Sequence, residues 1–135
     1  MNREEYQNSK IYFTKDNCPF CIEDVRKTHE ILFESKFWMV VFNKYPYFDE
    51  TGINLLVLPK RHLEFTSELL LEELSDFLEV EKFAKKFYEE KKLEYFSFIR
   101  QTKSNKSVEH LHYHYLPGKV SAKIIDGIKY LKIKN

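Results

Sequence analysis

The chain has 135 residues, of which 43% are hydrophobic and 16% aromatic, and its formal net charge is +1. This composition predicts a single domain with a hydrophobic core and excludes a disordered chain, and the balanced charge gives no general attraction to nucleic acid or acidic membranes. No apolar run approaches the roughly 20 residues of a membrane helix, and the polar start MNREEYQNSK is not typical of a signal peptide, so we expect a cytoplasmic protein.

The first predicted elements surround the only two cysteines, Cys18 and Cys21. A short strand is predicted over 10–13 and a helical turn over 21–27. The C-x-x-C of TKDNCPFC (14–21) is compatible with a redox couple, half of a zinc site or a small disulfide loop. Because cytoplasmic thiols stay reduced, a structural disulfide is disfavoured, and metal or redox chemistry remains.

The rest of the chain alternates strands with one long helix. Two apolar runs in 29–42 predict a hairpin, with 37–42 as its second strand, and a turn-rich segment follows. The apolar residues after Thr66–Ser67 recur at helical spacing and predict a helix that ends near Lys92. Further strands are predicted over 53–59, 95–101 and 109–117, with a turn over 102–107. Connections this short favour antiparallel pairing, so the expected fold class is α+β.

The C-terminal segment is basic. From Gly118 to Asn135 five lysines stand against one acid, Asp126. We interpret 118–135 as a solvated tail whose apolar residues pack in part on the domain or on a second subunit. The expected organisation is one domain, 1–135, with a core over about 18–117.

Three of the five histidines lie close together, at His110, His112 and His114. Side chains alternate along a strand, so these three would project from one face of the strand predicted here. Such an alternation is typical of a chemical site. Neutral imidazole binds zinc well, and it also serves as a nucleophile or proton donor at phosphate.

Counting ligands connects the histidines with the cysteines. A closed tetrahedral zinc site has four ligands, so Cys18 and Cys21 need two more donors. His62, which follows a predicted strand in PKRH, and the histidine cluster are the expected sources.

The segment HLHYHYL (110–116) resembles the signature of the histidine triad (HIT) family, H-x-H-x-H followed by two apolar residues. Upstream, NKYP (43–46) and LLVLP (55–59) look like the nucleotide-pocket strands of that family. The C-x-x-C and the histidine of PKRH resemble its zinc-bearing bacterial branch. The likeness covers roughly residues 18–117.

The resemblance implies a sheet of about five antiparallel strands with one long helix and an N-terminal zinc knuckle, usually as a homodimer. It implies hydrolysis or transfer at the α-phosphate of a nucleotide conjugate, such as a dinucleoside polyphosphate or a nucleoside phosphoramidate. His112 would be the nucleophile that forms a covalent nucleotidyl-histidine, and His114 would contact the phosphate oxygens or the leaving group. His110 would join Cys18, Cys21 and His62 on zinc, which is structural because a closed site has no open position.

Four further residues are expected at the substrate. Asn43 matches a family residue near the ribose, and Ser107 matches a small hydroxyl residue at the phosphate. Two positions depart from the family pattern: Asn105–Lys106 replaces a common Gly-Gln pair, and Asn54 stands where many members have a histidine. Lys106 is expected to offer a cation to the phosphate.

Two other functions compete with this interpretation. The departures at Lys106 and Asn54 leave open a catalytically weak module that binds a nucleotide or a protein partner. The stretch IYFTKDNCPFC (11–21) resembles a glutaredoxin, in which a helix start activates a thiol. A redox function would leave the three clustered histidines unexplained.

Overall fold

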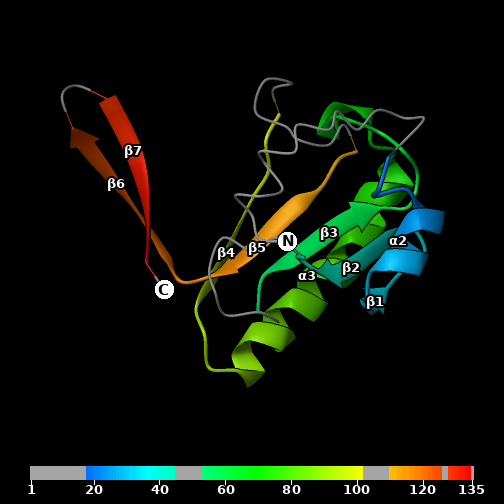
Figure 1. Ribbon diagram of the computed structural model, residues 1–135, viewed down its shortest axis with the longest axis horizontal. Helices are drawn as coiled ribbons and strands as arrows, with labels where there is room; N and C mark the ends of the chain where they lie inside the picture. The colour runs from blue at the N-terminus through cyan, green and yellow to red at the C-terminus, as the bar shows by residue number, and fades with distance from the viewer. Residues whose placement is uncertain (1–17, 45–52, 102–109, 126–127, 135) are drawn as a thin grey trace.

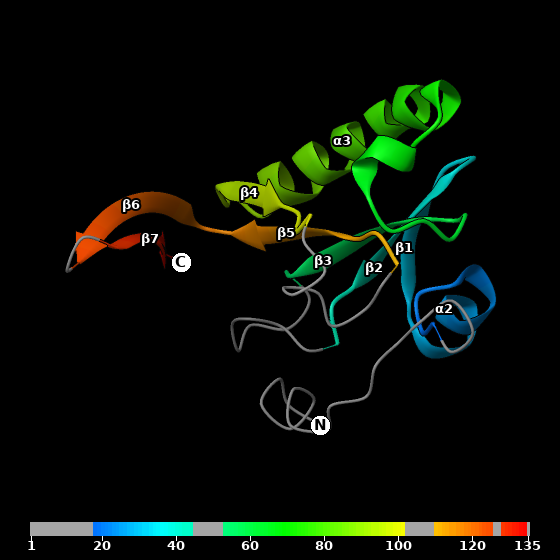
Figure 2. The ribbon, with the colours of Figure 1, turned by 90° about the horizontal axis from the view of Figure 1, so that it is seen from above.

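The computed structural model describes residues 18–44, 53–101, 110–125 and 128–134 of the chain. Five strands pair in an antiparallel sheet of order β1-β2-β3-β5-β4. Helix α3 lies along one face of this sheet, and the short helix α2 lies on the other side (Figures 1 and 2). The bounds are α2 (Ile22–Thr28), β1 (Ile31–Glu34), β2 (Trp38–Phe42), β3 (Leu55–Pro59), α3 (Leu71–Glu90), β4 (Tyr95–Phe98) and β5 (Tyr113–Pro117). The predicted α+β fold is confirmed.

The long helix begins later than predicted. A 3-10 turn, η2 (Thr66–Glu68), occupies the predicted first turn, and the α-helix starts at Leu71. The carboxylate of Glu73 reaches back to accept the backbone N–H of Leu70 at 2.9 Å. This bond satisfies one of the donors that a helix start leaves open and therefore fixes the start at this residue.

The last predicted strand of the sheet is shorter than expected. Strand β5 begins at Tyr113, so the prediction that His110 and His112 lie within a strand was wrong. The backbone N–H of Leu111 donates instead to the carbonyl of Leu63, in the loop after β3, at 2.6 Å. The strand predicted over 10–13 and the turn predicted over 102–107 lie outside the described residues.

The basic C-terminal segment forms secondary structure that we did not predict. Strands β6 (Lys119–Ile125) and β7 (Ile128–Lys134) pair as an antiparallel hairpin. Figures 1 and 2 show this hairpin extending away from the five-stranded sheet. A solvated tail is therefore not a sufficient description of 118–135.

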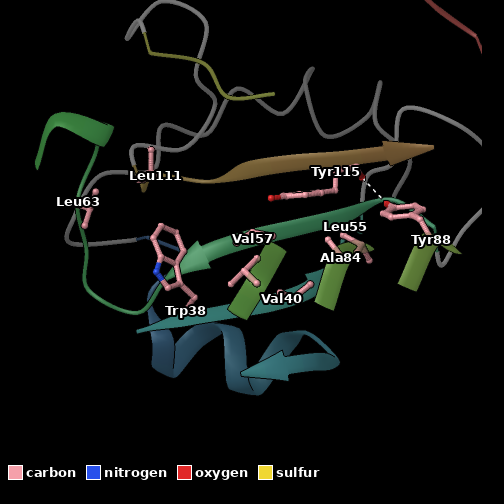
Figure 3. Packing of buried hydrophobic residues seen from close by; sticks show 10 residues of the cluster. Trp38, Val40, Leu55, Val57, Leu63, Ala84, Tyr88, Leu111 and Tyr115 are labelled. Carbon is pink, nitrogen blue, oxygen red and sulfur yellow. Dashed lines mark hydrogen bonds between the residues drawn. The ribbon is translucent and has the colours of Figure 1, made fainter. Parts of the chain in front are cut away.

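The central strands bury side chains on both faces, as a sheet covered on two sides requires. Toward α3, Trp38, Val40 and Val57 pack with Ala84 and Tyr88 of the helix (Figure 3). Toward α2 lies a second cluster, made of Met39, Val41, Leu56 and Leu58 of the sheet and Val25 of the helix. This second face is the one that meets the segment with the two cysteines.

Hydrogen bonds fix the docking of α3 on the sheet. The indole N–H of Trp38 donates to the carbonyl of Glu73 at 2.8 Å. Asp76 accepts from the Ser35 hydroxyl at 2.6 Å and from the Phe37 backbone N–H at 2.8 Å. At the other end, the Tyr88 hydroxyl donates to the carbonyl of Tyr115 at 3.1 Å (Figure 3). These hydrogen bonds satisfy polar groups along α3 and fix the position of the helix on the sheet.

A small ion-pair network fixes α2 against the sheet. Glu34 accepts from Arg26 of α2 at 2.8 Å and from Lys60, directly after β3, at 2.6 Å. These two hydrogen bonds lower the pKa of Glu34 from 4.5 to about 2. The network therefore ties the helix that follows the cysteines to the strand that precedes His62.

Replacing Glu34 with glutamine is expected to cost about 0.5–1 kcal/mol of unfolding free energy near neutral pH, since the pairs are partly exposed and screened. A lowered folded-state pKa contributes stability above the ordinary carboxyl value, and that contribution is lost as the pH falls through the folded-state value. The difference between wild type and Glu34→Gln should therefore shrink between pH 4.5 and about 2. Urea unfolding across this range measures it. Glu23→Gln, at an exposed acid of the same helix, is the control, and an equal loss in that variant would contradict the role of the network.

Candidate functional site: a metal cluster beside two histidines

Two cysteines and two histidines converge at one end of the interior strands, after β3 ends and before β5 begins. One ligand atom from each of Cys18, Cys21, His62 and His110 lies within 4.8 Å of all the others. The Sγ of Cys18 is 3.4 Å from Nδ1 of His110, and the Sγ of Cys21 is 3.2 Å from Nδ1 of His62. Both cysteines are free thiols. The four residues predicted as metal ligands are therefore gathered in one place.

The spacing of these atoms suits a tetrahedral ion. Zinc bonds of about 2.3 Å to sulfur and about 2.0–2.1 Å to nitrogen put neighbouring ligand atoms roughly 3.6 Å apart. The third sulfur–nitrogen distance, between Cys21 and Nδ1 of His110, is 3.7 Å. The Nε2–H of His110 donates to the carbonyl of Pro59 at 2.8 Å, which leaves the Nδ1 lone pair for an ion. The residues present therefore fit a metal ion.

The pKa values of Cys18 and His110 also favour metal binding over thiol redox chemistry. Burial, helped by the neighbouring Cys21, raises the pKa of Cys18 to about 12. A redox-active cysteine needs the opposite shift, so this thiol is inert unless a metal displaces its proton. Burial lowers the pKa of His110 to about 4, so that its imidazole is neutral and available as a ligand.

The loop that carries His62 is fixed by contacts with α3. The neighbouring Arg61 donates to the buried carboxylate of Glu73 at 2.8 Å and to the carbonyl of Glu68, also at 2.8 Å. The Arg61 hydrogen bond lowers the pKa of Glu73 and keeps that carboxylate charged. Because Glu73 also caps α3, the helix start and this ligand loop are positioned together.

His112 is held in one tautomer by the backbone. Its Nδ1 lies 2.8 Å from the carbonyl oxygen of His110, and the residue is 7% exposed. A carbonyl only accepts, so Nδ1 carries the proton and Nε2 carries the lone pair. The ring of Phe20, between the two cysteines, meets the His112 ring edge-on at 5.1 Å. The cysteine segment thus forms part of the wall around the His112 ring.

His114 lies beside His112 in a separate set of contacts. Their ring centroids are 5.0 Å apart. Phe98, the partner of His114 in the β4–β5 ladder, stacks flat on its imidazole at 4.7 Å and 7°. Nη2 of Arg100 approaches Nε2 of His114 at 3.3 Å. The last two histidines therefore face one another, while His110 is directed to the cysteines.

The predicted substrate residues are only partly described. Asn43 and Asn54 are neighbours, since the backbone N–H of Asn43 donates to the carbonyl of Asn54 at 2.9 Å. Asn54 is buried, two residues before Leu56, which pairs with His114 across β3 and β5. Lys106 and Ser107 lie outside the described residues.

Three residues of the site were missed by the sequence analysis: Phe20, Phe98 and Arg100. Phe20 entered that analysis only as part of the C-x-x-C segment, and Phe98 only as part of the strand predicted over 95–101. Arg100 is the only cation within the otherwise uncharged run YFSFIRQ (95–101). An isolated charge at the end of an apolar strand is the signal that points to it.

Comparisons with known proteins agree with this geometry. Residues 17–126 match the family model described as "Scavenger mRNA decapping enzyme C-term binding". No curated protein matched the sequence.

Solved structures named for the histidine triad share the fold. A HIT family hydrolase from Clostridium thermocellum is 24% identical, with a TM-score of 0.62 over 78% of this chain and 94% of its own. A histidine triad nucleotide-binding protein from Candida albicans is 23% identical, with a TM-score of 0.62 over 74% and 73% of the two chains. The diadenosine triphosphate hydrolase of Plasmodium falciparum is 19% identical, with a TM-score of 0.59 over 68% and 63%. Since the family model spans most of the chain, the protein belongs to the family described as "Scavenger mRNA decapping enzyme C-term binding", and it shares the fold of the solved histidine triad structures.

Proposed function

We propose that the protein hydrolyses or transfers a nucleoside monophosphate group at the α-phosphate of a nucleotide conjugate, through a covalent intermediate on His112. One observation carries this proposal. The hydrogen bond from Nδ1 of His112 to the carbonyl of His110 leaves Nε2 with its lone pair, as a nucleophile requires. Two structural neighbours, a HIT family hydrolase and a diadenosine triphosphate hydrolase, support the substrate class together with the family model.

The proposed reaction has two in-line steps. Nε2 of His112 attacks the α-phosphorus, a P–N bond forms, and the bond from phosphorus to the leaving group breaks with its electron pair on that group. Water then attacks the same phosphorus, loses a proton, and returns the electron pair of the P–N bond to Nε2. The division replaces one difficult displacement by two easier ones. In the first step the His110 carbonyl stabilises the positive charge that develops on the imidazole.

The remaining site residues have proposed supporting roles. His114 contacts the phosphate oxygens or the leaving group, and Asn43 and Asn54 contact the nucleoside side of the substrate. Lys106 and Ser107 contact the phosphate. These assignments rest on the family resemblance, and for His114 also on its position beside His112.

We propose zinc as the ion of Cys18, Cys21, His62 and His110. Two thiolates and two imidazoles form a donor set that zinc prefers. With four protein ligands its contribution is structural: it ties the segment of Phe20 to the start of the histidine segment. The metal would then support the reaction only by holding these two segments in place.

The test of this function is turnover combined with trapping. Purified wild-type protein is incubated with diadenosine triphosphate, adenosine 5′-phosphoramidate and their guanosine counterparts, and products are followed by chromatography. Rapid acid-free quenching and intact-mass measurement look for a nucleotidyl adduct. Turnover with an adduct on the peptide containing His112 is the expected result. Absence of both across the panel would instead support the alternative of a nucleotide-binding or partner-binding module, to which the substitutions at Lys106 and Asn54 point.

A glutaredoxin-like function is disfavoured by two observations. Burial raises the pKa of Cys18 instead of lowering it, and both cysteines converge with two histidines. The antiparallel sheet and the neighbours also belong to the histidine triad fold.

The assembly and location of the protein remain predictions. None of the helices in the described residues is long and apolar enough to cross a membrane. We retain the cytoplasm as the predicted location and the homodimer as the predicted assembly. Sedimentation velocity at several concentrations tests the dimer, which is expected to persist at low micromolar concentration.

A further inference from the structure

Arg100 occupies a position that neither the sequence pattern nor the proposed roles account for. It follows β4 in the chain, and it is half-buried beside His114. Its Nη2 lies 3.3 Å from Nε2 of His114, while the Phe98 ring stacked on His114 at 4.7 Å fixes the plane of the imidazole. Arg100 therefore contacts one defined nitrogen of one histidine.

This contact determines which nitrogen of His114 carries a proton. A guanidinium has only donors, so Nε2 of His114 must be the acceptor and is not protonated. His114 is consequently neutral and protonated at Nδ1. In this state Nε2 cannot supply a proton to a departing group, whereas the guanidinium beside it supplies a fixed positive charge.

The guanidinium also retains capacity to bind an anion. Its Nε is buried and has no hydrogen-bond partner within the part of the chain that the structure describes. Arginine presents five N–H donors in a planar fork that matches phosphate oxygens. A phosphate oxygen that reaches this fork would complete its hydrogen bonds.

Leaving groups differ in what they need from such a site. A phosphate or nucleotide departs with the electron pair of the broken P–O bond on its own oxygen, and it needs a cation but no proton. An amine departs from a P–N bond only if its nitrogen gains a proton as the bond breaks. The Arg100 guanidinium supplies a fixed positive charge, and Nε2 of His114 has no proton to donate. Together they favour leaving groups that depart as phosphate anions.

We propose that Arg100 is a specificity-determining residue that holds Nε2 of His114 as an acceptor and selects substrates whose leaving group is a phosphate anion over those that release an amine. The inference rests on the proposed function, because it assumes attack by His112 at the α-phosphorus. It assigns the choice between the two substrate classes to one side chain.

The test compares two substrates that give the same adenylyl intermediate. Diadenosine triphosphate releases ADP and adenosine 5′-phosphoramidate releases ammonia, so only the first step differs. Arg100→Gln is expected to lower kcat/KM for the triphosphate by about 100-fold, the usual cost of one charge-stabilising donor, while changing the phosphoramidate rate much less. Arg100→Lys should recover part of the loss because it restores the charge without the planar fork.

A control and a direct readout accompany the kinetics. Arg26→Gln removes the same charge from an exposed position on α2 and should leave the ratio of the two rates unchanged. Nitrogen-15 NMR of the histidines reports the tautomer of His114, which should be protonated at Nδ1 in the wild type and altered in Arg100→Gln. Equal losses on both substrates, or an unaltered tautomer, would overturn the role of Arg100. Failure of the wild type to cleave either substrate would overturn the proposed function itself.

Discussion

Replacing His112 with alanine is expected to reduce turnover of every accepted nucleotide by a factor on the order of 1,000 or more, because it removes the nucleophile of the first step. The carbonyl of His110 holds this imidazole with the proton on Nδ1 and the lone pair on Nε2, and no other group in the proposed mechanism has that arrangement. The loss should appear in both kcat and kcat/KM. Steady-state rates with diadenosine triphosphate and adenosine 5′-phosphoramidate measure it.

The same variant carries its own control for folding. His112 is not one of the four residues of the metal cluster, so His112→Ala should keep the metal content of the wild type and its cooperative unfolding. The nucleotidyl adduct should disappear from the intact-mass spectrum. Undiminished turnover in a well-folded, metal-loaded His112→Ala protein would falsify the covalent mechanism.

Local patterns predicted most of the fold. The uninterrupted apolar runs of β2 and β3 predict strands buried on both faces, and both faces are covered, by α3 and by the segment around α2. The helical spacing of Phe77, Phe83 and Tyr88 places these residues on the side of α3 that packs on the sheet. The connections between the predicted strands are short, and short connections favour antiparallel pairing.

The histidine segment shows where a local pattern fails. Alternation suggested one strand face for all three histidines, but His110 is directed to the cysteines while His112 and His114 face each other. The cause is a contact distant in sequence. The backbone N–H of Leu111 donates to the carbonyl of Leu63 in the loop after β3, and pairing within the sheet begins only at Tyr113. The family resemblance separated the role of His110 from the other two, which periodicity alone did not.

The contacts of Arg100 and Phe20 could not be read from the sequence for the same reason. Each depends on a partner more than ten residues away, and the C-x-x-C around Phe20 does not specify which ring that side chain meets. The C-terminal hairpin was missed because the number of lysines in 118–135 suggested a solvated segment. Within β6, the polar residues at 119, 121 and 123 nevertheless alternate with the apolar residues at 120, 122 and 124, which is the period that strands require.

Loss of the metal is the second change with a large expected effect. Cys18→Ser and His110→Ala each remove one of four ligands, and each should abolish stoichiometric zinc in the purified protein. The binding free energy of a structural zinc, about 10–16 kcal/mol in small domains, is part of the folding free energy. A decrease of several kcal/mol in unfolding stability is therefore expected, measured by urea unfolding with and without a chelator. Chelation should shift the wild type toward the variants and leave the variants unchanged.

Activity should fall with the metal, and the structure indicates why. Phe20 lies between the two cysteines and contacts the His112 ring, and the carbonyl that orients His112 belongs to the ligand His110. Loss of the metal would therefore release both the Phe20 ring and the His110 carbonyl that hold His112 in place. None of the four metal-binding residues is proposed to contact the substrate. Glu72→Gln, at an exposed acid of α3 outside the cluster, should retain both zinc and activity and serves as the control. Restored turnover on adding zinc back to chelated wild type, but not to Cys18→Ser, would establish that the cluster acts by positioning. Full activity in metal-free protein would contradict it, because the nucleophile would then be oriented without the cluster.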